Sequence, residues 1–171
     1  MNNTTTGLTL YLDMDGVICN FQEKYDEIAP ELPDKQRFAH AVLDQQIFLH
    51  LKPMSDAKKL VEHVATLKNI TIEMLTSVGT FDEERGLQAK LQKRAWLDKH
   101  NMFFTTNFVR CKAEKANYAN KNTILIDDSI GCIDPFNQKG GWGILHTSAD
   151  DTIKQLDEVF KKIREYRAYT T

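Results

Sequence analysis

The sequence has few of the features that mark secreted or membrane-bound proteins. Its three cysteines, Cys19, Cys111 and Cys132, show no CxxC spacing, so we expect reduced thiols rather than a disulfide framework. No apolar run approaches the ~20 residues of a membrane span. The first residues, MNNTTTG, lack the basic and apolar regions of a signal peptide. We therefore expect a soluble, cytoplasmic protein with a loose polar tail at residues 1–6.

An excess of positive charge is also missing. The 171 residues include 22 lysines and arginines against 24 aspartates and glutamates, which gives a net charge of -2. Nucleic-acid and acidic-membrane surfaces usually need a basic excess, so the composition favours neither partner. Hydrophobic residues make up 42% of the chain, which is enough for one domain with a buried core.

Short apolar runs alternate with longer helical patterns along the chain. The runs predict strands at 8–12, 70–75, 107–110, 123–126 and 143–146. Helices are predicted at about 20–29, 35–50, 55–67, 83–100 and 113–118, and from Ser148 onward, where a capping box begins. Such alternation is typical of βαβ units. We therefore expect an α/β fold, a Rossmann-like parallel sheet flanked by helices.

One segment interrupts this alternation. Two helices are predicted within residues 20–53 with no strand between them. We interpret this segment as a small helical cap inserted after the first strand, with residues 1–19 and 54–171 forming the core.

Polar side chains follow several of the predicted strands where each strand ends. They are Asp13, Asp15, Thr76, Ser77, Asp127 and Asp128. Ligands of open α/β sheets bind beyond the carboxyl ends of the strands, so these residues should gather at one edge. Converging carboxylates repel each other unless a cation neutralises them, and hard oxygen ligands suit Mg²⁺. The sequence thus predicts a Mg²⁺ site at this edge.

Such a site suits phosphoryl transfer. Asp13 would be the nucleophile and a metal ligand, and Asp15, on the following turn, the general acid/base. Hydroxyl and amide groups at Thr76 and Ser77 could bind phosphate oxygens. A lysine at a helix start would add positive charge near the transition state.

Each of these signals also has a simpler interpretation. DMDG could begin a calcium loop, but Val17 and Lys24 stand where that loop needs an oxygen ligand and a glutamate. The early aspartates could cap a helix, and Thr-Ser pairs are common in turns. A phospho-accepting receiver domain combines similar residues, but its acidic pair comes early in the chain rather than late. An inactive binding scaffold is disfavoured because no motif position is lost.

The order of the motifs resembles that of the haloacid dehalogenase-like hydrolases. DMDGV follows an apolar strand, and LTS, a helix-start lysine and LIDD come after it. Within this superfamily the chain is most similar to the 5'(3')-deoxyribonucleotidases and to phage-encoded phosphatases. The matching segments are DMDGVICNF, FLHLKPMSDA leading to MLTS, KRAWLDKH, and ILIDD followed by GGWGILH. The resemblance implies a Mg²⁺-dependent, 5'-nucleotidase-like hydrolase of phosphoric monoesters.

The resemblance also implies roles for the aspartates. Asp13 would be the nucleophile, and Asp15 the acid/base whose backbone carbonyl also reaches Mg²⁺. Asp128, together with Asp127, would complete the metal site.

Further roles concern the phosphate. Thr76, with Ser77 beside it, would hold the phosphate, and Lys93 in KRAW falls where relatives have a lysine near it. The lysine of the third motif has two candidates. Lys115 fits a KxxYA pattern before ILIDD and is favoured, while Lys112 fits a shorter reading in RCK.

The substrate is the least determined property. Phe21 and Phe48 match apolar positions near the substrate of the nucleotidases, although either could simply belong to the core of the cap. Cys132 and Phe136 replace residues that are often Asn and Trp in the phage proteins. Nucleoside monophosphates are the favoured substrates. The alternatives are another small phosphomonoester or a nucleic-acid 3'-phosphate end, and the sequence does not decide between a monomer and a homodimer.

Overall fold

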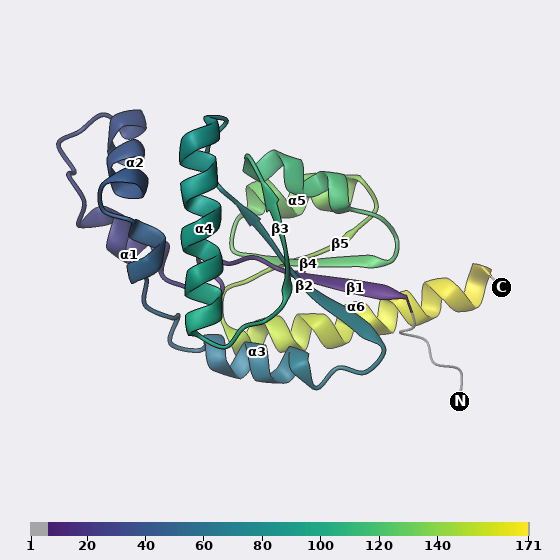
Figure 1. Cartoon of the computed structure of the whole chain (residues 1–171). Coiled ribbons are helices and arrows are strands. Elements are labelled where there is room, and N and C mark those ends of the chain that lie inside the picture. The colour runs from purple at the N-terminus through teal and green to yellow at the C-terminus, as the bar shows by residue number, and fades with distance from the viewer. Residues whose placement is uncertain (1–6, 171) are drawn as a thin grey trace.

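A computed structural model describes residues 7–170 of the chain and shows an α/β fold (Figure 1). The expected tail at residues 1–6 lies outside the described residues. The strands are β1 (Leu8–Leu12), β2 (Ile70–Ser77), β3 (Thr105–Val109), β4 (Thr123–Asp127) and β5 (Trp142–Leu145). They form one parallel five-stranded sheet in the order β3-β2-β1-β4-β5. The expected Rossmann-like sheet is confirmed.

Helices occupy most of the remaining chain. They are α1 (Phe21–Asp26), α2 (Asp34–Leu43), α3 (Ala57–Ala65), α4 (Glu83–Lys99), α5 (Ile130–Gln138) and α6 (Ala149–Thr170). Two short 3-10 helices, η1 (Ile47–His50) and η2 (Lys112–Tyr118), complete the set in the described residues.

The sheet is covered on both faces, because its side chains alternate between two apolar clusters. Leu10 and Leu12 of β1 belong to the larger cluster, together with Trp96 of α4 and residues of α3 and α6. Tyr11, between them, belongs to the smaller cluster with Phe136 of α5. In Figure 1, α3 and α6 accordingly run along one side of the sheet and α5 along the other. Such two-sided burial holds the strand ends in fixed positions.

The expectation of one helix over residues 35–50 is wrong. The helix α2 ends at Leu43, and Gln46 adopts a left-handed backbone conformation with a φ of 48°. A residue in this conformation cannot continue a right-handed helix. The chain turns there and places Phe48 on the separate η1, where the side chain is 2% exposed.

The helix α5 has no counterpart among the sequence predictions. Its segment contains Gly131 and Pro135, which both weaken an isolated helix. It forms because Cys132, Ile133 and Phe136 bury one face against the sheet. Packing outweighs local preference here.

The segment between β1 and α3 enters and leaves the core at one place. The backbone N–H of Asn20 donates to the carbonyl of Lys52, and that of Met54 donates to the carbonyl of Ile18. The segment also contacts α4, where the Trp96 indole donates a 2.8 Å hydrogen bond to the Leu51 carbonyl. Residues 20–53 are therefore tied at both ends, and α4 supports them from the side.

Candidate active site

The candidate site begins where β1 ends. The amide of Asp13 continues the sheet by donating to the carbonyl of Ile126 on β4, at 2.9 Å. Beyond it the chain curls tightly, since the amides of Ile18 and Cys19 both donate to the Met14 carbonyl. Gly16 makes this curl possible with a φ of 81°, a conformation that side chains disfavour. Asp13 is thus fixed at the sheet edge while Asp15 lies on the loop.

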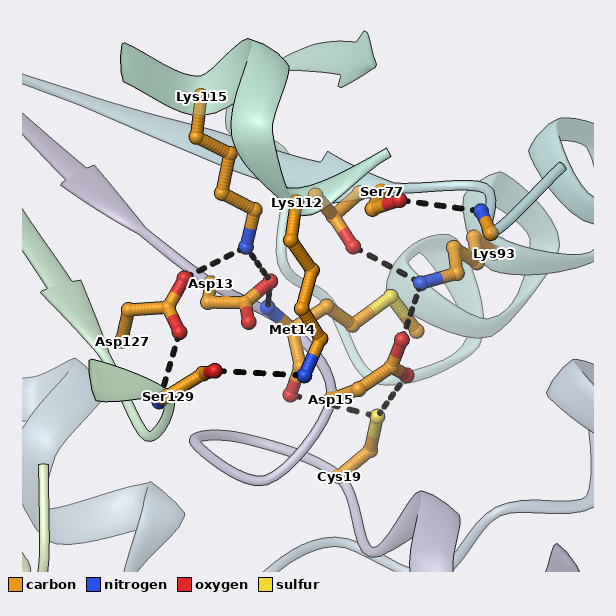
Figure 2. A network of polar contacts seen from close by, with 12 residues as sticks. Asp13, Met14, Asp15, Cys19, Ser77, Lys93, Lys112, Lys115, Asp127 and Ser129 are labelled. Atoms are coloured by element: carbon orange, nitrogen blue, oxygen red, sulfur yellow. Dashed lines mark hydrogen bonds and ion pairs between the residues drawn. The ribbon is translucent and has the colours of Figure 1, made fainter. Parts of the chain in front are cut away.

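A buried lysine joins two of the aspartates (Figure 2). The Lys115 ammonium lies 2.7 Å from Oδ1 of Asp13 and 2.6 Å from Oδ2 of Asp127. All three side chains are buried. The backbone amides of Met14 and Ser129 donate further bonds to Asp13 and Asp127. These contacts hold both carboxylates in single orientations.

Burial and charge act in opposite directions on this cluster. Burial raises the pKa of Asp13 to about 7, although the nearby Lys115 ammonium works against the rise. Burial alone would lower the pKa of Lys115, but the charges of Asp13 and Asp127 outweigh it and raise that pKa. The pKa of Asp128 is also raised, first by burial and then by the charge of Asp127. The site therefore holds more negative charge than one lysine neutralises.

Three carboxylates are placed to hold a cation. Ligand oxygens of Asp13, Asp127 and Asp128 all lie within 4.8 Å of one another. With Lys115 counted, the cluster keeps a formal charge that a divalent cation would balance. The donors are all hard oxygens, which fits Mg²⁺. Gly16 leaves room for this arrangement, because a Cβ there would collide with the Asp128 carboxylate.

The Asp15 carboxylate belongs to a second polar cluster. Its Oδ2 lies 2.5 Å from the ammonium of Lys93, which also donates to the Thr76 hydroxyl at 2.8 Å. Its Oδ1 accepts a bond from the Cys19 thiol at 3.4 Å. The carboxylate of Asp15 is thus turned toward Lys93 and away from Asp13 and Asp127, as Figure 2 shows.

The expected phosphate-binding residues separate into two groups. Ser77 borders the pocket, where its hydroxyl accepts a 3.0 Å bond from the Gly79 amide. Thr76 is fully buried and does not border the pocket. Its neighbour Lys93 is also fully buried and absent from the pocket wall.

The two lysines considered for the third motif occupy different environments. Lys115 is 1% exposed and contacts two aspartates, as described above. Lys112 is exposed at the mouth of the pocket, and its ammonium lies 3.4 Å from the Ser129 hydroxyl. Of the two, Lys115 forms ion pairs with the aspartates in the described structure.

A pocket of about 570 Å³ opens beside the aspartates. One end is polar and includes Asp13, Asp15, Ser77, Lys115 and Asp128. The other end is aromatic, where Phe21 stacks on Phe48 with ring centroids 5.6 Å apart. A ligand in this pocket would place an anionic group at one end and an apolar group at the other.

Several pocket residues were not found from the sequence. Phe38 on α2 and Phe81 after β2 both border the pocket. Phe38 reaches it because Gly79 adopts a φ of 73°, so the ring lies against the glycine where a Cβ would come within 2.9 Å. No periodicity signals such a contact. Gly16 could have been found, since it follows the DxD pair directly.

Comparisons with known proteins inform the fold. No protein-family model and no curated protein matches this sequence. A hydrolase from Streptococcus pneumoniae TIGR4 matches with a TM-score of 0.53 and 13% identity, over 87% of this chain and 97% of that one. A HAD-superfamily hydrolase from Ehrlichia chaffeensis matches with a TM-score of 0.50 and 12% identity, over 88% and 98%.

The chain shares the fold of these hydrolases. At such identities the likeness extends to the fold, so any activity must be argued from the residues of the pocket. Neither neighbour is described as a nucleotidase. Separately, no helix within residues 7–170 is long and apolar enough to cross a membrane.

Proposed function

We propose that the protein is a Mg²⁺-dependent phosphomonoesterase that works through an aspartyl-phosphate on Asp13. One observation carries the proposal: Asp13 is buried at a strand end, bridged by Lys115 to Asp127, and faces a pocket with room for a small ligand. The hydrolase-like fold supports it.

The reaction divides into two transfers. In the first, the Oδ2 of Asp13, which lacks the Lys115 contact, attacks phosphorus. The bond from phosphorus to the substrate oxygen breaks, and that oxygen takes a proton from Asp15. In the second, water attacks the aspartyl-phosphate and gives a proton back to Asp15. The bond from phosphorus to Asp13 breaks, and phosphate leaves.

The metal would be held by the carboxylates of Asp13, Asp127 and Asp128. The family resemblance adds the backbone carbonyl of Asp15 as a further ligand. When bound, Mg²⁺ would supply positive charge that screens the anionic nucleophile from the anionic phosphate. Lys115 keeps Asp13 oriented. Ser77, which borders the pocket at the end of β2, would bind the phosphate, with Thr76 buried next to it.

We propose nucleoside monophosphates, and deoxynucleoside monophosphates in particular, as the substrates. Phe21 and Phe48 line the aromatic end of the pocket, at a distance from the aspartates, and would contact the apolar part of a base or sugar there. In this proposal residues 20–53 act as the cap that carries both rings. A nucleic-acid end is the less favoured substrate, because the chain has 22 basic against 24 acidic residues and binding of such an end relies on phosphate contacts by basic residues.

A panel of phosphomonoesters, assayed with Mg²⁺ and with chelator, tests the proposal. Nucleoside monophosphates should be hydrolysed faster than sugar phosphates and DNA 3'-phosphate ends, and only with metal.

Asp13→Asn should reduce turnover to background while the fold survives, because an amide does not attack phosphorus. A folded Asp13→Asn protein with near-normal turnover would exclude the aspartyl-phosphate route. Faster turnover of sugar phosphates would leave the phosphatase chemistry and remove the nucleotidase assignment.

A further inference from the structure

We infer that Lys93 is a positioning residue for Asp15 and does not itself bind the substrate phosphate. The inference rests on the proposed function, since it concerns the group that moves the proton. It differs from the role implied by the sequence resemblance, which places a lysine of this segment near the phosphate.

The Lys93 ammonium is surrounded by groups of the protein itself. An ammonium has three N–H donors and no acceptor. Lys93 directs its ammonium at Oδ2 of Asp15 and at the Thr76 hydroxyl, and it lies 4.5 Å from the centroid of the Phe48 ring. The side chain is fully buried. Two oxygen atoms and one ring face thus surround the charge, and the side chain does not border the pocket.

The order of residues toward the pocket supports the same conclusion. Asp15 borders the pocket, whereas Lys93 lies behind it and does not. A phosphate in the pocket would therefore meet the carboxylate before the ammonium. Asp15 is held from two sides, by Lys93 on Oδ2 and by the Cys19 thiol on Oδ1. Without Lys93 the carboxylate would lose one of the two contacts that fix its orientation beside the pocket.

The Phe48 contact gives the arrangement a second consequence. The Lys93 ammonium lies over the Phe48 ring, and Phe21 stacks on the same ring at the pocket. The proton-transfer group and the aromatic wall are thereby connected through one ammonium. A cation held over a ring contributes to placing both partners.

Substrates with different leaving groups can show whether Lys93 positions Asp15 or binds the phosphate. An alkyl leaving group needs a proton, whereas p-nitrophenolate leaves without one. We therefore compare kcat/KM for p-nitrophenyl phosphate with that for the alkyl phosphate that the protein hydrolyses fastest. Lys93→Met should lower the alkyl value by roughly 10–100-fold, as expected for a misplaced catalytic group, and the aryl value far less. Lys90→Met, an exposed lysine on the same helix, is the matched control and should change neither.

A double-mutant cycle sharpens the test. If Lys93 acts through Asp15, adding Lys93→Met to Asp15→Asn should cost no further activity on the alkyl substrate. Equal losses on both substrates, a raised KM, and additive losses in the Asp15→Asn background would overturn the inference in favour of phosphate binding. If Lys93→Met does not fold, as judged by circular dichroism, Lys93→Gln is measured with the same two substrates and the same criterion.

The results of these assays also show whether a failure concerns Lys93 alone or the proposed function as a whole. No alkyl phosphate turned over by the wild-type protein, or a fully active Asp13→Asn, would defeat both. A wild-type phosphatase with an inactive Asp13→Asn and an unchanged alkyl-to-aryl ratio in a folded Lys93 variant would defeat the inference about Lys93 alone.

Discussion

Two lysine clusters lie side by side at the sheet edge, and they differ in what the lysine does for its aspartate. Lys115 joins Asp13 and Asp127 within a buried cluster and still borders the pocket. Lys93 contacts a single aspartate, Asp15, whose side chain is 27% exposed, and is itself shielded from the pocket. The first lysine neutralises two carboxylates that are almost fully buried, whereas the second orients a carboxylate that is more exposed to water.

The comparison teaches that an ion pair at a site has to be judged by its solvent access. Removing one partner of a buried pair leaves a charge without compensation. At a more open pair, water replaces part of the lost interaction. Removing Lys115 should therefore lower the stability of the fold strongly, whereas removing Lys93 should mainly impair proton transfer by Asp15.

The largest expected effect concerns Lys115. Lys115→Met should destabilise the fold by about 3–5 kcal/mol, because Asp13 and Asp127 would be left buried without a cation. Lys93→Met should cost only about 1–3 kcal/mol, since Asp15 can gain hydration. Urea unfolding of the two variants without metal measures the difference. A larger loss for Lys93→Met than for Lys115→Met would invert the comparison.

A smaller effect is expected at Gly16, between the two clusters. Gly140→Ala should cost about 1–2 kcal/mol, because this glycine has left-handed backbone, and Gly16→Ala somewhat more, because the Asp128 side chain would also have to move. Only at Gly16 would the new Cβ meet the Asp128 carboxylate, since nothing lies within 4 Å of one at Gly140. Titrating activity with Mg²⁺ should show a raised requirement for Gly16→Ala alone. Equal Mg²⁺ curves for both variants would argue against Asp128 as a ligand.

The smallest effect is expected at Lys112. It is exposed, and its contact with Ser129 is long at 3.4 Å. Lys112→Met should change the free energy of unfolding by less than about 0.5 kcal/mol, as is usual for surface substitutions. Thermal unfolding beside Lys115→Met provides the measurement. A loss comparable to that of Lys115→Met would mean that the two lysines share the charge of the cluster.

Some of this arrangement could be predicted from the sequence. Apolar runs that end in Asp13 and Asp127 indicated parallel strands, and the carboxyl-edge rule placed both aspartates together. The partners of these residues are less predictable. The contact between Asp15 and Lys93 depends on the curl of the loop at Gly16 and on the rotation of α4 about its axis. No periodic pattern in the sequence predicts either feature.

The helix α4 illustrates the limit most clearly. Its conspicuous apolar residues Leu87 and Leu91 are 55% and 56% exposed, while Gln92 and Lys93 face inward. A hydrophobic pattern alone would turn the helix the other way. The polar residues are buried because each finds a partner across the fold, such as the Val42 carbonyl for Gln92.

The paired backbone at the two ends of residues 20–53 has an evolutionary consequence. Because Asn20 and Met54 are anchored to residues directly across from them, the length of chain between the anchors is not dictated by the core. Lengthening such a closed excursion costs little chain entropy. Under the proposed function, an insertion or deletion within this segment would therefore change which substrates are accepted and leave the aspartates at the strand ends in place.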